Sequence, residues 1–370
     1  MSRLGFVGTP CQIQGLRKAQ ALGDLLENNW ANSVSLAIGL FCMGNWSYPC
    51  IRGYFEKHGI GLEKVTRIEI SGYDVEVSLN GSKIVLPLTG LRKYVKLACK
   101  LCLDFASELA DISVGSIGSP HGWSTVIVRS ELGEKVVTGA EAAEEIEVRE
   151  VGEEQLAKLA EVARKKIERN TRRILGRIRQ GMSIPHFNTR DAQNLEEILS
   201  LAKNKSFDEL WNEIVATGLC DACGACSAAC EHIEMRNGLP RLKKRCPQDC
   251  NRCYLACTRT ALPVRALERS LNLGDAYRQH LGRYRRVLAV RATSDDLLDR
   301  AQNGGAVTAL LKFSLNIGLV DGVVLTCRGE EWEPRAVFAR NGAEISNCAG
   351  TVYAASTPLP MFRHIKPVSI

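Results

Sequence analysis

The chain has 370 residues, 45% of them hydrophobic and 24% charged, and its formal net charge is +7. This length exceeds what one hydrophobic core usually supports, so we expect two or three domains. No run of about eighteen apolar residues occurs, which excludes a transmembrane helix, and the first residues lack a signal-peptide layout. We therefore expect a cytoplasmic protein, in which fifteen reduced cysteines indicate metal binding.

The first part of the chain alternates apolar strands with cysteines. We predict strands at Leu4–Val7 and Ser33–Phe41, which end close to Cys11 and Cys42, and a helix from about Ile13 to Leu22. Alternating faces predict three hairpin strands, at Val65–Ile70, Val75–Leu79 and Lys83–Leu86.

A C-x2-C pair, Cys99 and Cys102, follows these strands. A lone pair of this kind is a weak signal. Its weight increases because Cys11 and Cys42 lie at predicted strand ends, where the loops of an α/β sheet converge.

Two further strands are predicted at Ala110–Gly118, which breaks into a Gly/Ser loop, and at Gly122–Arg129. Glycine and serine in such a loop allow the backbone to approach a phosphate or a ring closely. Loops of this composition are more often plain turns.

Residues 141–179 are highly charged, with apolar residues at helical spacing between Leu156 and Ile178. We interpret this region as a solvated helix packed by one apolar stripe. A docking face for an acidic partner is the alternative. No aromatic residues are interleaved with the basic ones, which argues against nucleic acid. Gly181–Asn204 is interpreted as a connector with one short helix.

Eight cysteines then fall within 38 residues, in two tandem runs. Their spacing is that of a two-cluster bacterial ferredoxin, in which the fourth cysteine of each run ligates the other cluster. One 4Fe–4S cluster is therefore assigned to Cys220, Cys223, Cys226 and Cys257, and a second to Cys246, Cys250, Cys253 and Cys230. Gly224 would let the backbone pass close to the first cluster.

Zinc and disulfides are the alternatives for these eight residues. A zinc ribbon needs only two C-x2-C pairs and would leave four cysteines unexplained. The runs differ from the usual ferredoxin pattern at Glu231 and Thr258, which replace proline, and in the x3 spacing that opens the second run.

The last hundred residues return to an α/β pattern. Arg286–Ala292 is a predicted strand, Asn303–Thr308 opens an apolar helix that continues to about Leu319, Asp321–Thr326 is a turn and strand, and Ala336–Ala339 is another strand.

These segments resemble the beta-subunit family of coenzyme F420-reducing hydrogenase and formate dehydrogenase. The resemblance is carried by eight stretches: VGTPCQIQGLRK (7–18), GLFC (39–42), CKLCLDF (99–105), ADISVGSIG (110–118), GWSTVIVRS (122–130), GLCDACGAC (218–226), NGGAVTALL (303–311) and DGVV (321–324). VGTPCQ, CxxCxDF and ADISVG together form a specific set.

The resemblance implies an FAD-binding oxidoreductase subunit that exchanges a hydride with coenzyme F420 and passes electrons through 4Fe–4S clusters to a partner protein. It assigns a third cluster to Cys11, Cys42, Cys99 and Cys102. For FAD it favours Asn303, Gly304, Gly305 and Thr308, together with Ser113, Gly115, Ser116 and Gly118. Cys50, Cys327 and Cys348 remain and are interpreted as structural.

The implied fold class is α/β, with a mixed-sheet flavoprotein core in two halves and a small α+β ferredoxin-like domain. We divide the chain into residues 1–150, the C-terminal-type half of the family domain; 151–205, a basic helical connector; 206–265, the ferredoxin-like domain; and 266–370, the N-terminal-type half.

The order of the two halves is reversed relative to the family. Three readings remain open: a circular permutant, a fusion of the tail of one copy to the head of the next that neighbouring chains complete as a homo-oligomer, or a rearranged and inactive product. The functional alternatives are an electron carrier without flavin chemistry, and the same scaffold serving another donor or acceptor.

Overall fold

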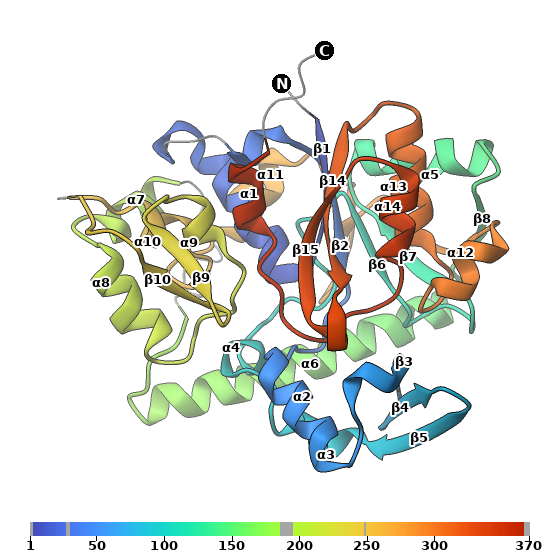
Figure 1. The fold of residues 1–370 in the computed structure, drawn as a ribbon. Helices are drawn as coiled ribbons and strands as arrows, with labels where there is room; N and C mark the ends of the chain where they lie inside the picture. The colour runs from blue at the N-terminus through green and yellow to red at the C-terminus, as the bar shows by residue number, and fades with distance from the viewer. Residues whose placement is uncertain (1–2, 27–29, 186–194, 248, 366–370) are drawn as a thin grey trace.

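The computed structural model describes residues 3–26, 30–185, 195–247 and 249–365. Its centre is an eight-stranded mixed sheet with the order β15-β14-β1-β2-β6-β7-β13-β8 (Figure 1). The strands of this sheet are β1 (Leu4–Gly8), β2 (Val34–Leu40), β6 (Ile112–Gly115), β7 (Ser124–Val128), β8 (Ile146–Glu150), β13 (Arg286–Ala292), β14 (Gly322–Arg328) and β15 (Pro334–Ala339).

Three small antiparallel sheets accompany the central one. They are formed by β3 (Val65–Ser71), β4 (Asp74–Leu79) and β5 (Ser82–Pro87); by β9 (Ile233–Arg236) and β10 (Leu239–Leu242); and by β11 (Ala276–Arg278) and β12 (Gly282–Tyr284). The β3–β5 strands confirm the three predicted hairpin strands to within two residues at each end.

The α-helices are distributed along the whole chain. They are α1 (Pro10–Leu22), α2 (Tyr48–Lys57), α3 (Leu88–Arg92), α4 (Leu97–Lys100), α5 (Glu131–Ala142), α6 (Glu153–Arg179), α7 (Glu196–Ala202), α8 (Phe207–Leu210), α9 (Ala225–Ala228), α10 (Arg252–Ala256), α11 (Val264–Ser270), α12 (Asp295–Arg300), α13 (Ala306–Asn316) and α14 (Gly342–Asn347).

Most of the central strands run in one direction. β14, β1, β2 and β6 are mutually parallel, and β13 runs the same way because both it and β6 are antiparallel to β7. The C-terminal ends of these five strands therefore lie along one side of the sheet, which we call the carboxyl edge. In open α/β sheets this is the side where ligands bind.

Both faces of the sheet are covered, which explains why inner strands such as β1, β2 and β7 are largely apolar and buried. On one face, α1 packs with the cysteine segment, and Leu4 and Phe6 of β1 join the same hydrophobic cluster. On the other face lie α5 and α13, whose apolar side chains contact Val7, Leu36 and Ile38. The alternation along β1 and β2 thus places each residue in one of two cores.

The two halves recognised in the sequence share this one sheet. The first half supplies β1, β2, β6, β7 and β8, and the second supplies β13, β14 and β15. They interleave: β1 pairs with β14 in parallel, with Leu4 opposite Gly322, and β13 lies between β7 and β8. One chain therefore forms the whole sheet.

The charged region after residue 130 holds more structure than its pattern indicates. The helix α5 and the edge strand β8 precede α6, and sequence analysis identified neither. β8 is short and highly charged, but Ile146 is buried, Val148 packs partly against the same core, and the strand pairs with β13. The guanidinium of Arg149, the residue after Val148, lies 4.0 Å from the centre of the Trp123 ring.

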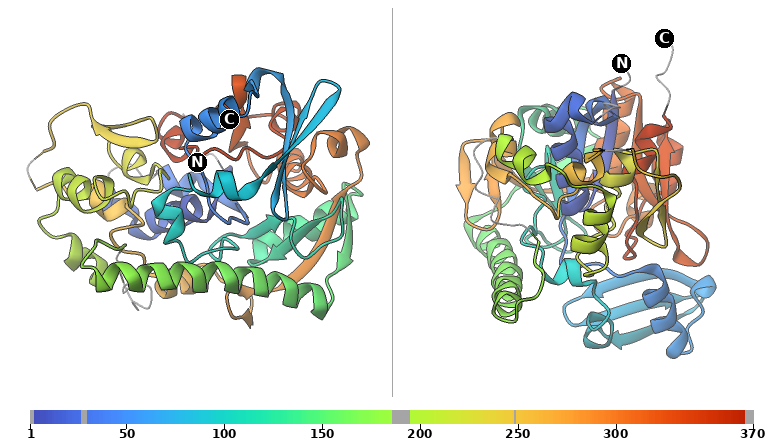
Figure 2. Two further views of the ribbon diagram at one scale, coloured as in Figure 1. Left: turned by 90° about the horizontal axis from the view of Figure 1, so that it is seen from below. Right: turned by 90° about the vertical axis from the view of Figure 1, so that its left-hand side faces the viewer.

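The long helix α6 crosses the molecule below the carboxyl edge, from the β8 end of the sheet to the cysteine segment (Figure 2). Leu156, Leu159 and Ala163 pack it against Phe105 and Ile127. Residues 153–179 are therefore part of the folded core, although sequence analysis assigned them to a connector.

The β3–β5 sheet lies beyond the carboxyl edge, as Figures 1 and 2 show. It is tied to the loops there: Arg328 Nη1 donates to Thr66 O at 2.9 Å, and Trp332 Nε1 donates to Val65 O at 2.9 Å. Arg67 Nη2 donates to Gln302 O at 3.1 Å. The β3–β5 sheet is thus tied to the loop after β14 and to Gln302, the residue before Asn303.

Candidate iron–sulfur and flavin sites

Four of the predicted ligands line one cavity. These are Cys220, Cys223, Cys226 and Cys257, the set assigned to the first ferredoxin-type cluster. The remaining wall is largely apolar and includes Leu210, Ile214 and Val215, with Asp221 and Arg259 as charged members. A thiol-lined, apolar pocket of this kind is the environment that an iron–sulfur cluster requires.

The loop around this cavity adopts the conformation expected from its spacing. Gly224 has φ +87°, and a Cβ there would meet Pro360 Cδ at 2.7 Å. Ala222 also has a positive φ, +66°. These two left-handed residues curl the C-x2-C-x2-C run so that its thiols share one space.

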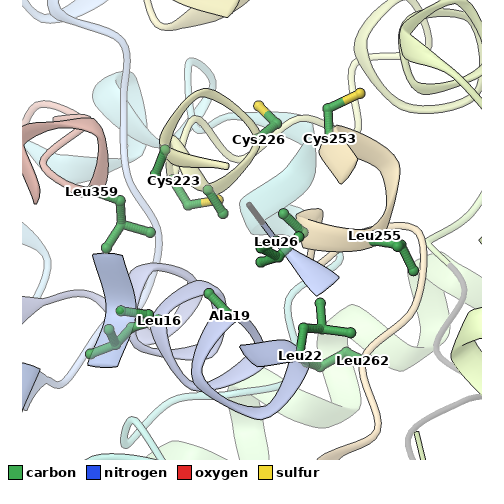
Figure 3. Close-up of a cluster of buried hydrophobic side chains, with 14 of the residues drawn as sticks. Leu16, Ala19, Leu22, Leu26, Cys223, Cys226, Cys253, Leu255, Leu262 and Leu359 are labelled. Carbon is green, nitrogen blue, oxygen red and sulfur yellow. The ribbon is translucent and has the colours of Figure 1, made fainter. Parts of the chain in front are cut away.

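α1 supports the same loop from below. Leu16, Ala19 and Leu22 of α1 belong to the same hydrophobic cluster as Cys223, and Figure 3 shows Ala19 below Cys223 and Leu22 beside Leu262. Gly15 allows the close approach, because a Cβ there would lie 3.1 Å from Leu359 Cδ1 and 3.8 Å from Cys223 Sγ. Gly15 is one turn after Cys11, so α1 brings two predicted cluster sites together.

The second ferredoxin-type set is also grouped. Burial is the largest cause of the raised pKa values of Cys253 and Cys246. The neighbouring thiols add to it: Cys230, Cys246 and Cys250 raise the pKa of Cys253, and Cys250 and Cys230 raise the pKa of Cys246. Cys257 also acts on Cys253. The two sets are therefore neighbours, as the exchange of the fourth ligand between runs requires.

The third set lies at the carboxyl edge. Cys11 is on the first turn of α1, and Thr9 Oγ1 lies 3.3 Å from its Sγ. Cys42 follows β2, and its N–H donates to Phe105 O at 2.9 Å, which joins the β2 loop to the C-x2-C loop. Cys42 and Cys102 both raise the pKa of Cys99, to about 12, with burial as the larger cause.

Two polar residues of α6 contact this third set. Lys166 Nζ donates to Cys42 O at 2.7 Å and Asp104 O at 2.5 Å. Burial is the largest single influence and lowers the pKa of Lys166, but the neighbouring Cys102, Cys42 and Asp104 together raise that pKa above the ordinary lysine value. Asn170 Nδ2 donates to Cys102 O at 2.7 Å.

A buried ion pair lies between the first and third sets. Arg259 Nε donates to Asp221 Oδ2 at 2.9 Å, and the two side chains are 4% and 3% exposed. Asp221 Oδ1 also accepts from Cys223 N at 3.1 Å. Cys11 acts on the pKa of both Arg259 and Cys223, which places the pair where the two thiol sets meet.

Burial dominates the chemistry of these thiols. It raises the pKa of Cys11, Cys223 and Cys226 well above the ordinary thiol value, and raises that of Cys220 to about 12. Without a bound cation such thiols stay protonated at neutral pH, and iron binding must release their protons.

Arg17 of α1 and Asp111, the residue before β6, form a second buried ion pair. Arg17 Nη2 donates to Asp111 Oδ2 at 2.7 Å, and Asp111 also accepts from Ala37 N at 2.8 Å and Ser130 Oγ at 2.7 Å. One carboxylate thus ties together α1, β2 and Ser130, the N-cap residue of α5. It holds the helix that carries Cys11 against the sheet.

The residues predicted to bind FAD fall into two adjoining groups. Gly304 approaches β7 so closely that a Cβ there would lie 2.7 Å from Ser124 N, and β7 pairs with the β6 strand of Ser113 and Gly115. Gly305 has φ +69° and precedes α13, the helix that carries the buried Thr308. Asn303 is half-buried beside them.

Within the β6 group the residues differ. Ser113 is fully buried, donates to Ser107 O and accepts from Arg129 Nε, so its hydroxyl is used inside the protein. Gly115 accommodates Phe41, since a Cβ there would fall 2.0 Å from that ring. Gly118 packs against α6, and only Ser116 is exposed. Packing accounts for three of these four positions.

The remaining cysteines lie apart from the three sets. Cys327 and Cys348, interpreted as structural, form a disulfide between the end of β14 and the residue after α14. Cys50 is a partly exposed free thiol on α2. In the described parts of the chain, no three His, Cys, Asp or Glu side chains are arranged to hold a single metal ion, and no helix is long and apolar enough to cross a membrane.

Sequence analysis missed Lys166, Asn170, Asp221 and Arg259. The signal for the first two was available, because both lie on the buried side of α6, at positions where a solvated helix would carry apolar residues. Nothing in the spacing of the cysteines pointed to Arg259.

Two segments match models of one known family. Residues 1–154 match the C-terminal domain of the coenzyme F420 hydrogenase/dehydrogenase beta subunit, and residues 287–363 match its N-terminal domain. The chain belongs to this family. Its two domains stand in swapped order, as the sequence motifs indicated. The cysteine segment and most of α6 lie between the matched ranges.

Two relatives show what fraction of this chain, and of each relative, can be aligned. The coenzyme F420 hydrogenase subunit beta of Methanothermobacter thermautotrophicus is 33% identical over 50% of this chain and 67% of its own length. The coenzyme F420-dependent sulfite reductase of Methanocaldococcus jannaschii is 36% identical over 46% of this chain, which is only 28% of that protein.

A solved structure is also similar. A chain of the F420-reducing NiFe hydrogenase complex from Methanosarcina barkeri shares 35% identity over 48% of this chain and 62% of its own length, with a TM-score of 0.43. The chain thus covers between about a quarter and two thirds of these relatives.

Proposed function

We propose that this family oxidoreductase is an iron–sulfur flavoprotein subunit that transfers electrons between coenzyme F420 and a partner protein. FAD would lie at the carboxyl edge, and three 4Fe–4S clusters would lead from it. The observation that carries the proposal is the grouping of twelve cysteines into three adjoining sets, which are ordered from the carboxyl edge into the cysteine segment.

The order of the sets defines the path. The core set (Cys11, Cys42, Cys99 and Cys102) adjoins the first ferredoxin-type set where Cys11 lies near Cys223. The first ferredoxin-type set adjoins the second where Cys257 lies near Cys253. Closely spaced clusters of this kind carry single electrons, and the exposed end of the series would face the partner.

The flavin site would be built from loops at the carboxyl edge. Gly304 brings the backbone close to β7, Gly305 packs against Leu297 and Ala292, and the free N–H groups at the start of α13 suit a phosphate. The exposed Ser116 and half-buried Asn303 could meet the rest of the cofactor. When bound, FAD supplies the exchange between a hydride pair and single electrons. The protein would position it and exclude water.

A single chain would suffice for this site. Both halves supply strands to one sheet, and the two predicted flavin segments adjoin each other within it. This arrangement favours the circular-permutant reading over completion by a second chain. It predicts one FAD per monomer, measured by flavin extraction after size-exclusion chromatography.

Reduction of the bound flavin by different electron donors tests whether coenzyme F420 is the substrate. Reduced coenzyme F420 should bleach the flavin absorbance of the anaerobically purified protein, whereas NADH should not. Bleaching by NADH alone would assign the scaffold to another donor. Protein that contains about eight irons and no flavin would identify an electron carrier without flavin chemistry.

Cys99→Ser tests the core set. It should remove the EPR signal of one cluster and about four irons, leaving the ferredoxin-type signals intact. The matched control is Cys50→Ser, a partly exposed thiol outside the three sets, which should change neither. Retention of every signal in Cys99→Ser would refute the core-cluster assignment.

A further inference from the structure

Lys166 is almost fully buried, although lysine is among the residues most rarely buried. Its side chain is 1% exposed, on a helix whose neighbouring cations face solvent. It lies outside both segments that match the family. Burying an ammonium group costs far more than burying an apolar chain of the same length, so stability alone does not account for a lysine here.

The ammonium group of Lys166 is fully engaged by the predicted core set. A lysine has three N–H donors and no acceptor. Two donors are used by Cys42 O at 2.7 Å and Asp104 O at 2.5 Å. The third faces Cys102 Sγ at 3.7 Å. Each acceptor belongs to a predicted ligand or to the loop that carries one.

Asn170, one turn further along α6, extends this contact. Its Nδ2 donates to Cys99 O at 3.1 Å and Cys102 O at 2.7 Å. α6 therefore contacts three of the four predicted core ligands, through two adjacent polar side chains on its buried side. The helix that joins the two swapped halves thus fixes both loops of the core site.

The electrostatic consequence follows from the charge on a cluster. A 4Fe–4S cluster with four thiolate ligands is an anion, and reduction makes it more negative. A fixed buried cation and a hydrogen bond to a ligand sulfur both favour the reduced form and raise the reduction potential.

We propose that Lys166 is a positioning residue for the core iron–sulfur site, and that its charge raises the reduction potential of that cluster. This inference rests on the core-cluster assignment of the proposed function. It makes the helix between the two swapped halves a determinant of where electrons reside between the flavin and the ferredoxin-type clusters.

Lys166→Met tests this inference, with Lys165→Met as the matched control. Lys165 is the preceding residue of the same helix, but its side chain is 68% exposed and pairs with Glu161 on the surface. Each variant, purified anaerobically, is analysed for iron per chain and titrated electrochemically with EPR detection of each cluster.

We expect Lys166→Met to keep its iron and to shift the midpoint of the core signal to a more negative potential, with the ferredoxin-type midpoints unchanged. Lys165→Met should leave all midpoints at their wild-type values. A core midpoint in Lys166→Met equal to that of wild type would overturn the proposal, while leaving the core-cluster assignment intact.

If Lys166→Met loses the core cluster, so that its potential cannot be measured, Lys166→Arg is the second variant to test. Arginine keeps the positive charge at this position. Recovery of the core EPR signal in Lys166→Arg would support the role of the charge, and its absence from a folded Lys166→Arg protein would overturn it. Failure of the underlying function is detected separately, by Cys99→Ser retaining every cluster.

Discussion

Asp111→Asn removes one charge from a buried ion pair at the base of α1. The asparagine keeps the size of the side chain, and its oxygen can still accept from Arg17 and from the Ala37 N–H. Its amide group can face Ser130 Oγ, which also has acceptor capacity. The main loss is therefore the charge opposite Arg17, whose other partners are the neutral Leu109 O and Gln20 Oε1.

The size of this loss follows from the contact. Unit charges about 4 Å apart at an effective dielectric constant near 20 attract by about 4 kcal/mol. Removing one partner of a buried pair typically costs about 3–5 kcal/mol, because the other charge stays buried and uncompensated. We expect Asp111→Asn to lower the free energy of unfolding by that amount.

Urea unfolding followed by circular dichroism measures this effect. At a slope of about 3 kcal/mol per molar urea, the midpoint should fall by roughly 1 M or more. Asp321→Asn is the control, since the Arg3–Asp321 pair is 56% and 30% exposed and such pairs contribute about 0–1 kcal/mol. Equal midpoint shifts in the two variants would refute the reasoning.

Three further predictions concern the cluster sites. Gly15→Leu should push away the loop of Cys223 and lower the iron content. The control Gly176→Leu, at an open position of α6, should keep its iron. Equal iron content in the two variants would show that the contact between Gly15 and the Cys223 loop is not needed for cluster binding. Because burial raises the pKa of Cys11, Cys223 and Cys226, reconstitution should release protons, and loading at limiting iron should fall from pH 8 to pH 6. The cluster-free protein should also lose stability above about pH 8.5, where the unfolded chain ionises these thiols and the folded chain does not. Loading that is independent of pH would argue against buried, protonated thiols.

The sequence predicted those features that depend on local spacing. The C-x2-C runs determine which thiols share a loop, and the alternation of β1 and β2 indicates strands buried on both faces. Family motifs then joined Cys11 and Cys42 to the C-x2-C pair far along the chain. In the structure the loop of Cys42 contacts the loop that follows Cys102, and the shared cluster remains a prediction.

Features that depend on tertiary partners were not predictable. β8 is a strand because β13 offers it an edge, and its own charged sequence does not reveal this. On α6, Leu175 and Ile178 were assigned to the packed stripe but are 47% and 51% exposed, whereas Lys166 and Asn170 are buried. From the sequence alone, a polar residue at such a position is assigned to the exposed face of the helix, because the groups that it contacts in the fold are not known.

The swapped order raised the question of whether one chain forms a complete site. The pairing of β1 with β14 shows that strands from opposite ends of the chain are neighbours in one sheet. The swapped order of the two domains therefore changes which strands the loops connect, but one chain still supplies the strands of both halves to the central sheet. The helix α6, which lies in the segment that joins the halves, then contributes to the core site directly.

The most direct test is the cofactor content of the anaerobically purified monomer. Iron, acid-labile sulfide and flavin are measured on the monomer fraction from size-exclusion chromatography. We expect about twelve irons and one FAD per chain, because a single chain would hold three 4Fe–4S clusters and one flavin. About eight irons without flavin, or flavin found only in oligomers, would contradict it.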